Sequence, residues 1–535
     1  MKKWFLMPLA AAFFFYGFKI KSIDKPKLVV FISVDQGMPS LLKKYDHLFY
    51  GGLRWLMDHG VQFENVFHNH GHTVTGPGHY SIVSGRYPGK EGIIANEWYD
   101  RNLNRVWYCV EDTTSIELSD SSTGRSYKNI NVTALGDWLK ESTPNSKIVS
   151  ISGKDRAAVF MGGKNPNMVL WDDRMGSYTT STYYADSLPL WVKEETKKRN
   201  IPAYRDSIWN RILPEKIYNK NTRDDYTYGE ADYTMKNGYS PIFPIKFDET
   251  ELSEFLGFFY SLPYGDELTI QLGKKAIEIY EMGMDSYIDI LFLGLSATDG
   301  IGHSFGPHSH EQMDNYLRLD KQLGILIQSL EESIGKGNVL YILTSDHGAV
   351  DLPEYAQSQG KDAGRIQKAT RNAMYESALK EIESKIGPDQ VIQYGNNFYY
   401  NEKMGYFAKR RATKILKNTF LKIPGVSAVL TREEILRGGD SELEIRLNNM
   451  IHPQKSPDVY LIPKKYWTWR YQAGSSHGTH YDYDAHVPFI IAKGGGKGKS
   501  ISKKVFSVDI APTVARLLGV PYPDDLDGKP IPIKN

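Results

Sequence analysis

Residues 28–35 read LVVFISVD, an apolar run that is rich in β-branched side chains and ends in an aspartate. Because the run is apolar on both faces of an extended chain, it predicts a strand in the middle of a sheet, covered on both sides. Four further runs have the same character: KIVSISG (147–153), IDILFLGLSATD (288–299), VLYILTSDHG (339–348) and HVPFIIA (486–492). The sequence therefore predicts an α/β protein with a doubly wound, mostly parallel central sheet and helices on both faces.

Amphipathic helices lie between these runs. Residues 311–330 read EQMDNYLRLDKQLGILIQSL, in which the large apolar residues are spaced by three and four positions, as on one face of a helix. They are Tyr316, Leu319, Leu323, Leu326 and Leu330. Residues 509–519, DIAPTVARLLG, predict a second helix that ends at a glycine.

Two stretches depart from this alternation. Residues of about 201–266 are rich in Tyr and Asn and show little periodicity, and about 353–470 contains its own predicted helices and strands. We expect both to be insertions that cap one edge of the sheet, within a single domain that spans residues 27–535.

The first 22 residues resemble an export signal. They begin MKK and continue with an apolar run that is short for a helix of ~20 residues that crosses a bilayer. No clear cleavage site follows, so an uncleaved N-terminal anchor is the alternative. We expect a periplasmic or secreted protein, with membrane contact only through this segment.

The overall composition restricts the kinds of partner and metal site. The chain has 65 Lys and Arg against 63 Asp and Glu, a formal net charge of +2, which gives no indication of nucleic-acid binding. Cys109 is the single cysteine, so neither an intrachain disulfide nor a cysteine-based zinc site is possible. Any metal must be held by Asp and His. The sequence does not specify an oligomeric state, and a monomer is the simplest expectation.

Acidic and imidazole side chains follow the predicted core strands. The three aspartates and three histidines in these positions are Asp35, Asp299, His303, Asp346, His347 and His477. One strand-end aspartate alone is more often a cap or turn residue. Six such residues converging on the ligand-binding edge of a sheet predict two sites of oxygen and nitrogen ligands, which suit two Zn²⁺ ions.

The stretch HTVTGPGHYS (72–81) predicts a nucleophile beside these sites. Thr75 precedes GPG, a sequence that favours the start of a helix, where free N–H groups favour an anion. A hydroxyl next to a metal ion ionises near neutral pH. The alternative is that Thr75 only caps the helix.

These motifs together resemble the alkaline phosphatase superfamily, in the branch with a threonine nucleophile that includes nucleotide pyrophosphatase/phosphodiesterases and PafA-type phosphatases. The resemblance runs from about residue 27 to 533 and implies an alkaline phosphatase-like catalytic domain. It implies that one zinc is held by Asp299, His303 and His477, and the other by Asp35, Asp346, His347 and Thr75. It also implies that Asn96, in GIIANEWYD, donates a hydrogen bond to a phosphoryl oxygen.

Lys154 and Arg156, in SISGKDRAAVF, favour one branch over the other. They resemble the Lys-x-Arg of PafA-type monoesterases, which diesterases of the superfamily generally lack. A monoester dianion carries one more charge than a diester, so two cations in a dry site favour it. The alternative is a solvated surface pair.

We therefore expect an alkaline phosphatase that hydrolyses phosphate monoesters through a covalent phosphothreonine on Thr75. Two alternatives stay open: a phosphodiesterase or nucleotide pyrophosphatase with the same metal ligands, and an inactive homologue that binds at a surface. The histidines of HNHGH, His68, His70 and His72, are not needed as ligands, and we expect them to lie around the site or on the surface.

Overall fold

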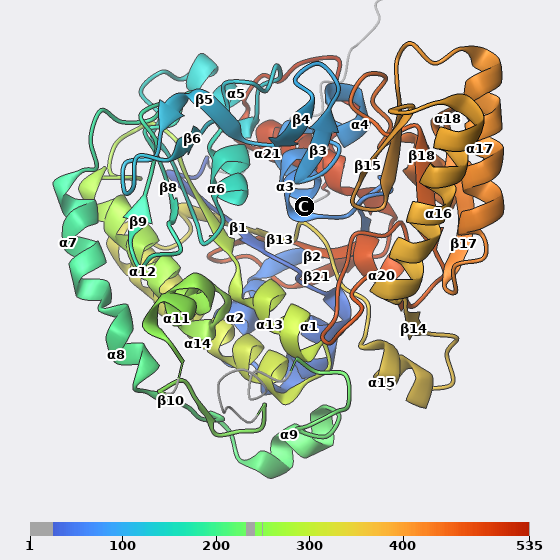
Figure 1. Ribbon diagram of the computed structural model, residues 1–535. Coiled ribbons are helices and arrows are strands. Elements are labelled where there is room, and N and C mark those ends of the chain that lie inside the picture. The colour runs from blue at the N-terminus through green and yellow to red at the C-terminus, as the bar shows by residue number, and fades with distance from the viewer. Residues whose placement is uncertain (1–24, 232–240, 249, 534–535) are drawn as a thin grey trace, which may run out of the picture.

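The computed structural model describes residues 25–231, 241–248 and 250–533, so the predicted export signal at residues 1–22 lies outside the described residues. A ten-stranded sheet crosses the middle of the molecule (Figure 1). Its order is β21-β2-β20-β13-β1-β12-β7-β8-β9, and β22 also pairs with β2. The strands are β1 (Leu28–Val34), β2 (Gly60–Phe67), β7 (Ile148–Ser152), β8 (Met168–Asp172), β9 (Tyr178–Thr179), β12 (Asp289–Leu295), β13 (Val339–Thr344), β20 (His486–Lys493), β21 (Lys499–Ile501) and β22 (Val505–Phe506).

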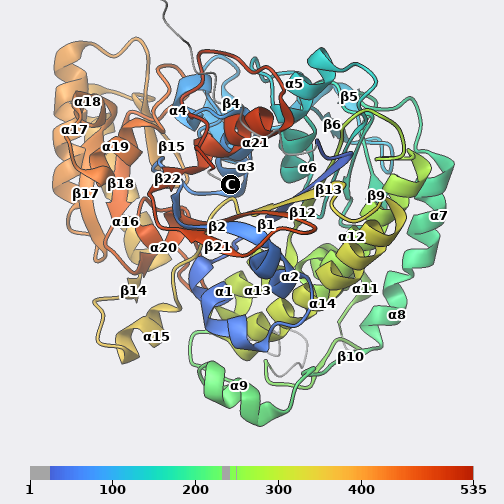
Figure 2. The same cartoon turned by 180° about the vertical axis from the view of Figure 1, so that it is seen from behind.

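Helices cover both faces of the sheet, as Figures 1 and 2 show. One face carries α3 (Thr75–Ser84), α5 (Leu135–Ser142), α6 (Asp155–Gly162) and α21 (Ile510–Leu518). The other carries α1 (Pro39–Tyr45), α2 (Gly52–His59), α12 (Pro263–Ile279) and α14 (His310–Ser333). Strand β1 shows why both faces need cover, because Val30 and Ile32 belong to one hydrophobic core while Val29 and Phe31 belong to the other. The predicted doubly wound α/β fold is confirmed.

The two helices read from the sequence are present. All five apolar residues of the 311–330 pattern are buried along α14, and α21 ends before Gly519, whose φ of 69° is left-handed. Two strands run against their neighbours. β13, β1, β12, β7 and β8 are mutually parallel, whereas β20 runs antiparallel to both β13 and β2, and β9 runs antiparallel to β8.

The segment of residues 353–470 has a sheet and a hydrophobic core of its own. The sheet order is β15-β16-β18-β17, and the segment stands at one side of the molecule in both views. Its elements are α15 (Pro353–Ser358), β14 (Gly364–Arg365), α16 (Lys368–Ile386), β15 (Val391–Tyr394), β16 (Asn397–Tyr400), α17 (Tyr406–Phe420), β17 (Val426–Thr431), α18 (Arg432–Arg437), α19 (Glu442–Asn448), β18 (Val459–Pro463) and β19 (Trp467–Thr468).

The described part of the segment at about 201–266 is shorter and packs an aromatic core against α13 (Ala297–Phe305). Its elements are α8 (Ile201–Arg205), β10 (Ile208–Trp209), α9 (Glu215–Asn221), β11 (Ile245–Lys246), α11 (Leu252–Phe258) and the 3₁₀ turn η2 (Phe259–Ser261), and α12 begins at its end.

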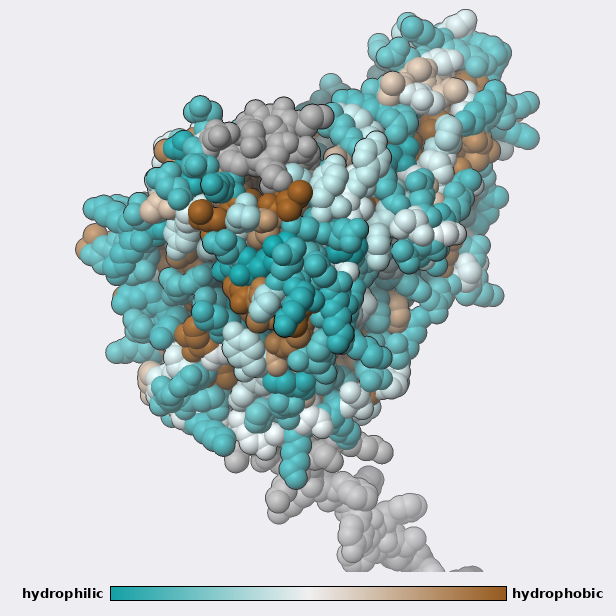
Figure 3. Space-filling view, turned by 90° about the horizontal axis from the view of Figure 1, so that it is seen from below, coloured by the Kyte–Doolittle hydropathy of each residue, from teal (hydrophilic) through white to brown (hydrophobic). Residues whose placement is uncertain are grey.

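The other elements are short or peripheral. They are η1 (Asp46–Leu48), α4 (Pro88–Glu91), β3 (Glu97–Asp100), β4 (Arg105–Tyr108), β5 (Glu111–Ile116), β6 (Thr123–Arg125), α7 (Leu190–Arg199), α20 (Asp482–Ala485) and η3 (Ser507–Asp509). Within the described ranges, no helix combines the length and apolar character that crossing a membrane requires. The face seen in Figure 3 is largely hydrophilic, with small apolar patches.

Candidate active site

The predicted site residues meet at one edge of the central sheet. Strands β13, β1, β12 and β7 are consecutive neighbours, and all four end at this edge. Asp35 follows β1 directly, Asp346 lies two residues after β13, and Lys154 lies between β7 and α6. The strand order therefore gathers side chains that are up to 311 positions apart in the chain.

The antiparallel direction of β20 explains how His477 joins them. A residue that precedes a parallel strand lies at the opposite edge from residues that follow its neighbours. Because β20 is antiparallel, its first residue, His486, lies at the edge where β13 ends. The loop before it, which carries His477, therefore reaches the site.

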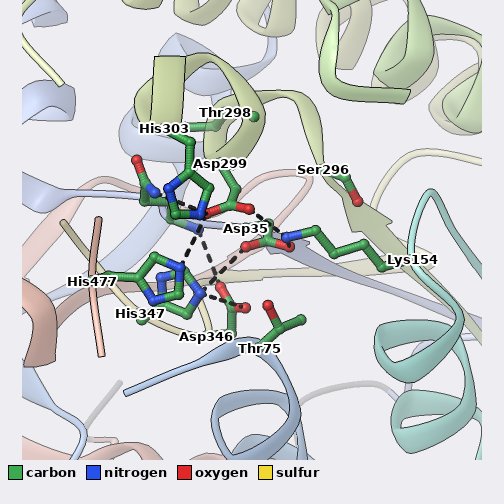
Figure 4. Close-up of polar contacts among 12 residues, drawn as sticks. Asp35, Thr75, Lys154, Ser296, Thr298, Asp299, His303, Asp346, His347 and His477 are labelled. Atoms are coloured by element: carbon green, nitrogen blue, oxygen red, sulfur yellow. Dashed lines mark hydrogen bonds and ion pairs between the residues drawn. The ribbon is translucent and has the colours of Figure 1, made fainter. Parts of the chain in front are cut away.

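Asp299, His303 and His477 form one compact group of possible metal ligands. Asp299 and His303 stand on one face of α13, four residues apart. The Nε2 atoms of His303 and His477 lie 3.3 and 3.5 Å from Asp299 Oδ1 (Figure 4). One ligand atom from each of the three lies within 4.8 Å of the others.

A second group adjoins the first. His347 Nε2 lies 3.2 Å from Asp346 Oδ2 and 3.5 Å from Asp35 Oδ1. One ligand atom from each of Asp35, Asp299 and His347 also lies within 4.8 Å of the other two, so Asp299 belongs to both groups. The rings of His347 and His477 stack with their centroids 3.6 Å apart. The structure thus brings together all six predicted Asp and His residues.

The chemistry of these groups fits divalent metal ions. Asp346 Oδ2 and His347 Nε2 are buried, and their 3.2 Å contact does not have the geometry of a hydrogen bond, so among the described residues neither atom has a hydrogen-bond partner. Burial and the neighbouring His347 hold the pKa of His477 well below its ordinary value, so the ring is neutral and able to bind a metal. Burial and Asp346 raise the pKa of Asp35, a cost that a bound cation would remove. Buried carboxylates with neutral imidazoles are a typical zinc ligand set.

Thr75 is the first residue of α3, and Val74 occupies the cap position without a side-chain hydrogen bond. The alternative that Thr75 serves only as the helix cap is therefore wrong. Gly78 allows the start of this helix to lie close to the metal-ligand groups. A Cβ at this position would lie 2.2 Å from the backbone oxygen of Asp346, so a larger residue would push the helix away. Figure 4 shows Thr75 beside Asp346, below the carboxylates.

Arg156 reaches the Thr75 hydroxyl. Its Nη2 atom donates to Thr75 Oγ1 over 3.4 Å, and its Nη1 atom donates to the Tyr108 hydroxyl over 3.3 Å. Tyr108 in turn donates to Asp155 Oδ1 over 2.6 Å. Only 18% of the Arg156 side chain is exposed, so it is not a solvated surface residue.

Asn96 and Lys154 lie on two other sides of the site. The Asn96 side-chain oxygen accepts a hydrogen bond from the Gly76 backbone N–H over 2.7 Å, which fixes the amide beside the start of α3. Lys154 Nζ lies 2.5 Å from Asp35 Oδ2 and from Asp299 Oδ2. Burial alone would lower the pKa of Lys154, but these two carboxylates hold it above its ordinary value. Lys154 is therefore charged and placed between the two groups.

Two contributors were not predicted. The Gln36 side chain donates to Asp299 Oδ1 over 2.8 Å from a residue whose φ is 63°. His79 Nδ1 lies 3.0 Å from the Thr75 carbonyl oxygen and 3.3 Å from Asp346 Oδ2. Gln36 follows a strand-end aspartate and His79 lies one helical turn after Thr75, and these positions are the signals that could have identified them.

Two of the HNHGH histidines, His68 and His72, contact loops of the site. His68 and His70 are fully buried, and burial lowers the pKa of His68 to about 4. His68 Nε2 lies 3.1 Å from the Ser345 carbonyl oxygen, and His72 Nδ1 lies 3.1 Å from that of Gly478. These contacts are with the loops that carry His347 and His477.

Comparison with known proteins defines the class. The family model "Type I phosphodiesterase / nucleotide pyrophosphatase" matches residues 29–486, and the chain belongs to this family. Within it, the chain is similar to alkaline phosphatase PafA of Elizabethkingia meningoseptica, with 32% identity over 99% of this chain and 98% of the relative. Alkaline phosphatase PhoV of Synechococcus elongatus is 32% identical over 96% of this chain and 93% of its own.

The solved structures agree with the sequences. A crystal structure of wild-type PafA has a TM-score of 0.87 and 31% identity, covering 95% of this chain and 99% of that one. A second structure is a PafA variant in which a threonine, an asparagine, a lysine and an arginine are replaced, with a TM-score of 0.87. The resemblance to PafA-type proteins is confirmed.

Proposed function

We propose that this chain is an alkaline phosphatase that hydrolyses phosphate monoesters with Thr75 as nucleophile and two bound zinc ions. The observation that carries the proposal is the position of the Thr75 hydroxyl, 3.4 Å from Arg156 Nη2 and beside two adjoining groups of Asp and His side chains. The threonine and asparagine replaced in the PafA variant have the same mutual spacing as Thr75 and Asn96, and the lysine and arginine have that of Lys154 and Arg156.

In the proposed reaction, Thr75 Oγ attacks phosphorus, its proton passes to solvent, and the bond to the ester oxygen breaks. The alcohol leaves with a proton, and water then cleaves the phosphothreonine to release phosphate. Asp299, His303 and His477 would hold one zinc, and Asp35, Asp346 and His347 the other. When bound, the ions lower the pKa of adjacent hydroxyls and compensate negative charge.

The chain's own cations and amides orient the phosphoryl group. Arg156 is fixed by Tyr108, and Asn96 is fixed by Gly76, so neither needs to reorganise when charge develops on the phosphoryl oxygens. Lys154 supplies a further positive charge among the carboxylates. We propose that residues 27–535 form this catalytic domain, with insertions at about 201–266 and 353–470. We also propose that residues 1–22 are an export signal, or an N-terminal anchor, of a periplasmic or secreted protein.

The test is to trap the intermediate. Acid quenching during turnover of an aryl phosphate, followed by peptide mass spectrometry, is expected to find phosphate on Thr75. Thr75→Ala should remove the label and the activity, whereas Thr75→Ser should keep the label. Turnover at the wild-type rate by Thr75→Ala would disprove the covalent mechanism.

The family model leaves phosphodiester hydrolysis as a second candidate. The two candidates share every Asp and His ligand. They differ in the charge of the substrate, because Arg156 and Lys154 would favour a monoester dianion over a diester monoanion. A comparison of kcat/KM for matched monoester and diester substrates decides between them.

A further inference from the structure

An aromatic cavity opens beside the metal-ligand helix α13. It has a volume of about 240 Å³ and lies between α13, η2 and the strands β10 and β11. Its walls include Trp209, Ile245, Phe247, Tyr260, Leu262 and Phe305. Because these walls are mostly apolar, the cavity favours an uncharged, flat ligand.

The cavity is continuous with the first metal-ligand group. His303 is part of its lining, together with Arg470. The His303 side chain is 28% exposed, compared with 8% for His477 and 6% for Asp299. A molecule bound near this group therefore has most access from the His303 side.

The reaction geometry selects the same side. In phosphoryl transfer, the attacking and leaving oxygens lie on opposite sides of phosphorus. Thr75 stands on α3, on one side of the carboxylates, and His303 stands on α13, on the other (Figure 4). A leaving group opposite Thr75 would therefore point toward α13 and its cavity.

We propose that this cavity binds the leaving group of the substrate, and that the preferred substrates are monoesters of aromatic or similarly flat, apolar alcohols. The inference rests on the proposed function. The volume is sufficient, since an engineered apolar cavity of ~150 Å³ binds benzene. Aromatic walls add edge and offset contacts with a ring.

A second cavity is the alternative place where the leaving group could bind. It has a volume of about 180 Å³ and is lined by His477, Glu97, Asn396 and Asn397, among others. Most of its lining is apolar, including Trp98, Tyr399 and Trp469, so the position of this cavity, and not its polarity, distinguishes it from the first. It also borders Ala95 and Glu97, the neighbours of Asn96, which lies on the Thr75 side of the site.

Two variants with opposite effects test the proposal. Leu262→Trp fills the cavity, and Phe258→Ala, at a half-buried position of the lining, enlarges it. With Leu262→Trp, kcat/KM for phenyl phosphate relative to ethyl phosphate should fall at least ~10-fold against the wild-type ratio. With Phe258→Ala, the ratio of 1-naphthyl to phenyl phosphate should rise. Intrinsic reactivity cancels in both comparisons, and Leu190→Trp, at a 71% exposed position on α7, should change neither.

Equilibrium dialysis with 1-naphthol is a readout that does not depend on turnover. The wild type should bind 1-naphthol and Leu262→Trp should bind it at least ~10-fold more weakly. Unchanged ratios in both variants, or a change of the phenyl-to-ethyl ratio by Asn397→Ala instead, would overturn the proposal. If Leu262→Trp fails to fold, Phe258→Ala decides alone. A wild type that binds 1-naphthol but hydrolyses none of these esters would refute the proposed function and not the cavity.

Discussion

The most discriminating perturbation is Arg156→Ala. Arg156 is held by Tyr108 and reaches to 3.4 Å from the Thr75 hydroxyl, so a phosphoryl group attacked by Thr75 would lie about 4 Å from the guanidinium. At that distance and an effective dielectric constant of about 20, the attraction between the guanidinium and one unit of negative charge contributes roughly 4 kcal/mol. This corresponds to a factor of about 10³ in rate. Loss of one preorganised donor in other enzymes costs a similar ~10²–10³.

A monoester presents one more negative charge than a diester, so this penalty should fall mainly on the monoester. The assay is kcat/KM for an aryl phosphate monoester and the matching diester at alkaline pH. We expect the monoester value to fall by ~10²–10³ and the ratio of monoester to diester to fall nearly as much.

Arg125 offers a matched control. Its Nε donates to Asp155 Oδ2 over 3.0 Å and its guanidinium lies over the Tyr108 ring, so Arg125→Ala disturbs the same support. That variant should change the ratio less than ~10-fold. Equal losses on both substrates in Arg156→Ala would refute the charge argument and favour phosphodiester hydrolysis.

Four further predictions concern the nucleophile, the metals and acid stability. A chiral phosphate ester should transfer with net retention at phosphorus, because attack by Thr75 and then by water inverts it twice; net inversion would indicate direct attack by water. Treatment with a chelator should lower the melting temperature measured in a scanning calorimeter, and added zinc should restore it, because ions that bind only the folded chain stabilise it. An unchanged melting temperature after complete loss of metal would contradict the assigned ligands. Replacing His477 by Ala should lower the zinc content measured by mass spectrometry, whereas His486→Ala, at a more distant histidine, should not. Burial lowers the pKa of His480 to about 4, below its unfolded value, so its neutral form contributes stability above about pH 6.5 that is lost as the pH falls toward 4. In urea titrations, the free energy of unfolding of His480→Gln should therefore depend less on pH in this window than that of the wild type. An identical pH dependence would refute the assignment.

The central sheet could be predicted because its signal is local. Each face of β1 is buried, and the alternation of Val29 and Val30 between two cores follows from an uninterrupted apolar run. The convergence of Asp35 and Asp346 was also accessible, since parallel strands end at a common edge and both residues follow such strands.

The direction of individual strands and the contacts between side chains could not be predicted as well from the sequence. The sequence of β20 does not reveal its direction, because the apolar pattern of a buried strand is the same in both directions. The contact of Gln36 with Asp299 depends on a left-handed backbone and on a neighbour 263 positions away. Lys154 was predicted to favour a phosphate monoester dianion, and its 2.5 Å contacts with two carboxylates depend on the packing of three strand ends.

The place of β20 in the sheet also constrains how the protein folds. Among the described strands, β2 (residues 60–67) pairs with β21 and β22 on one side and with β20 on the other, and β20, which ends at residue 493, connects it to β13 and the strands beyond. During synthesis, more than 400 residues must therefore emerge before β2 can pair on that side. Pairing over so long a separation slows folding and leaves strand edges open to other chains in the meantime. His477 arrives with the same strand, so a nascent chain has its complete set of metal-ligand residues only after residue 477 has been synthesised.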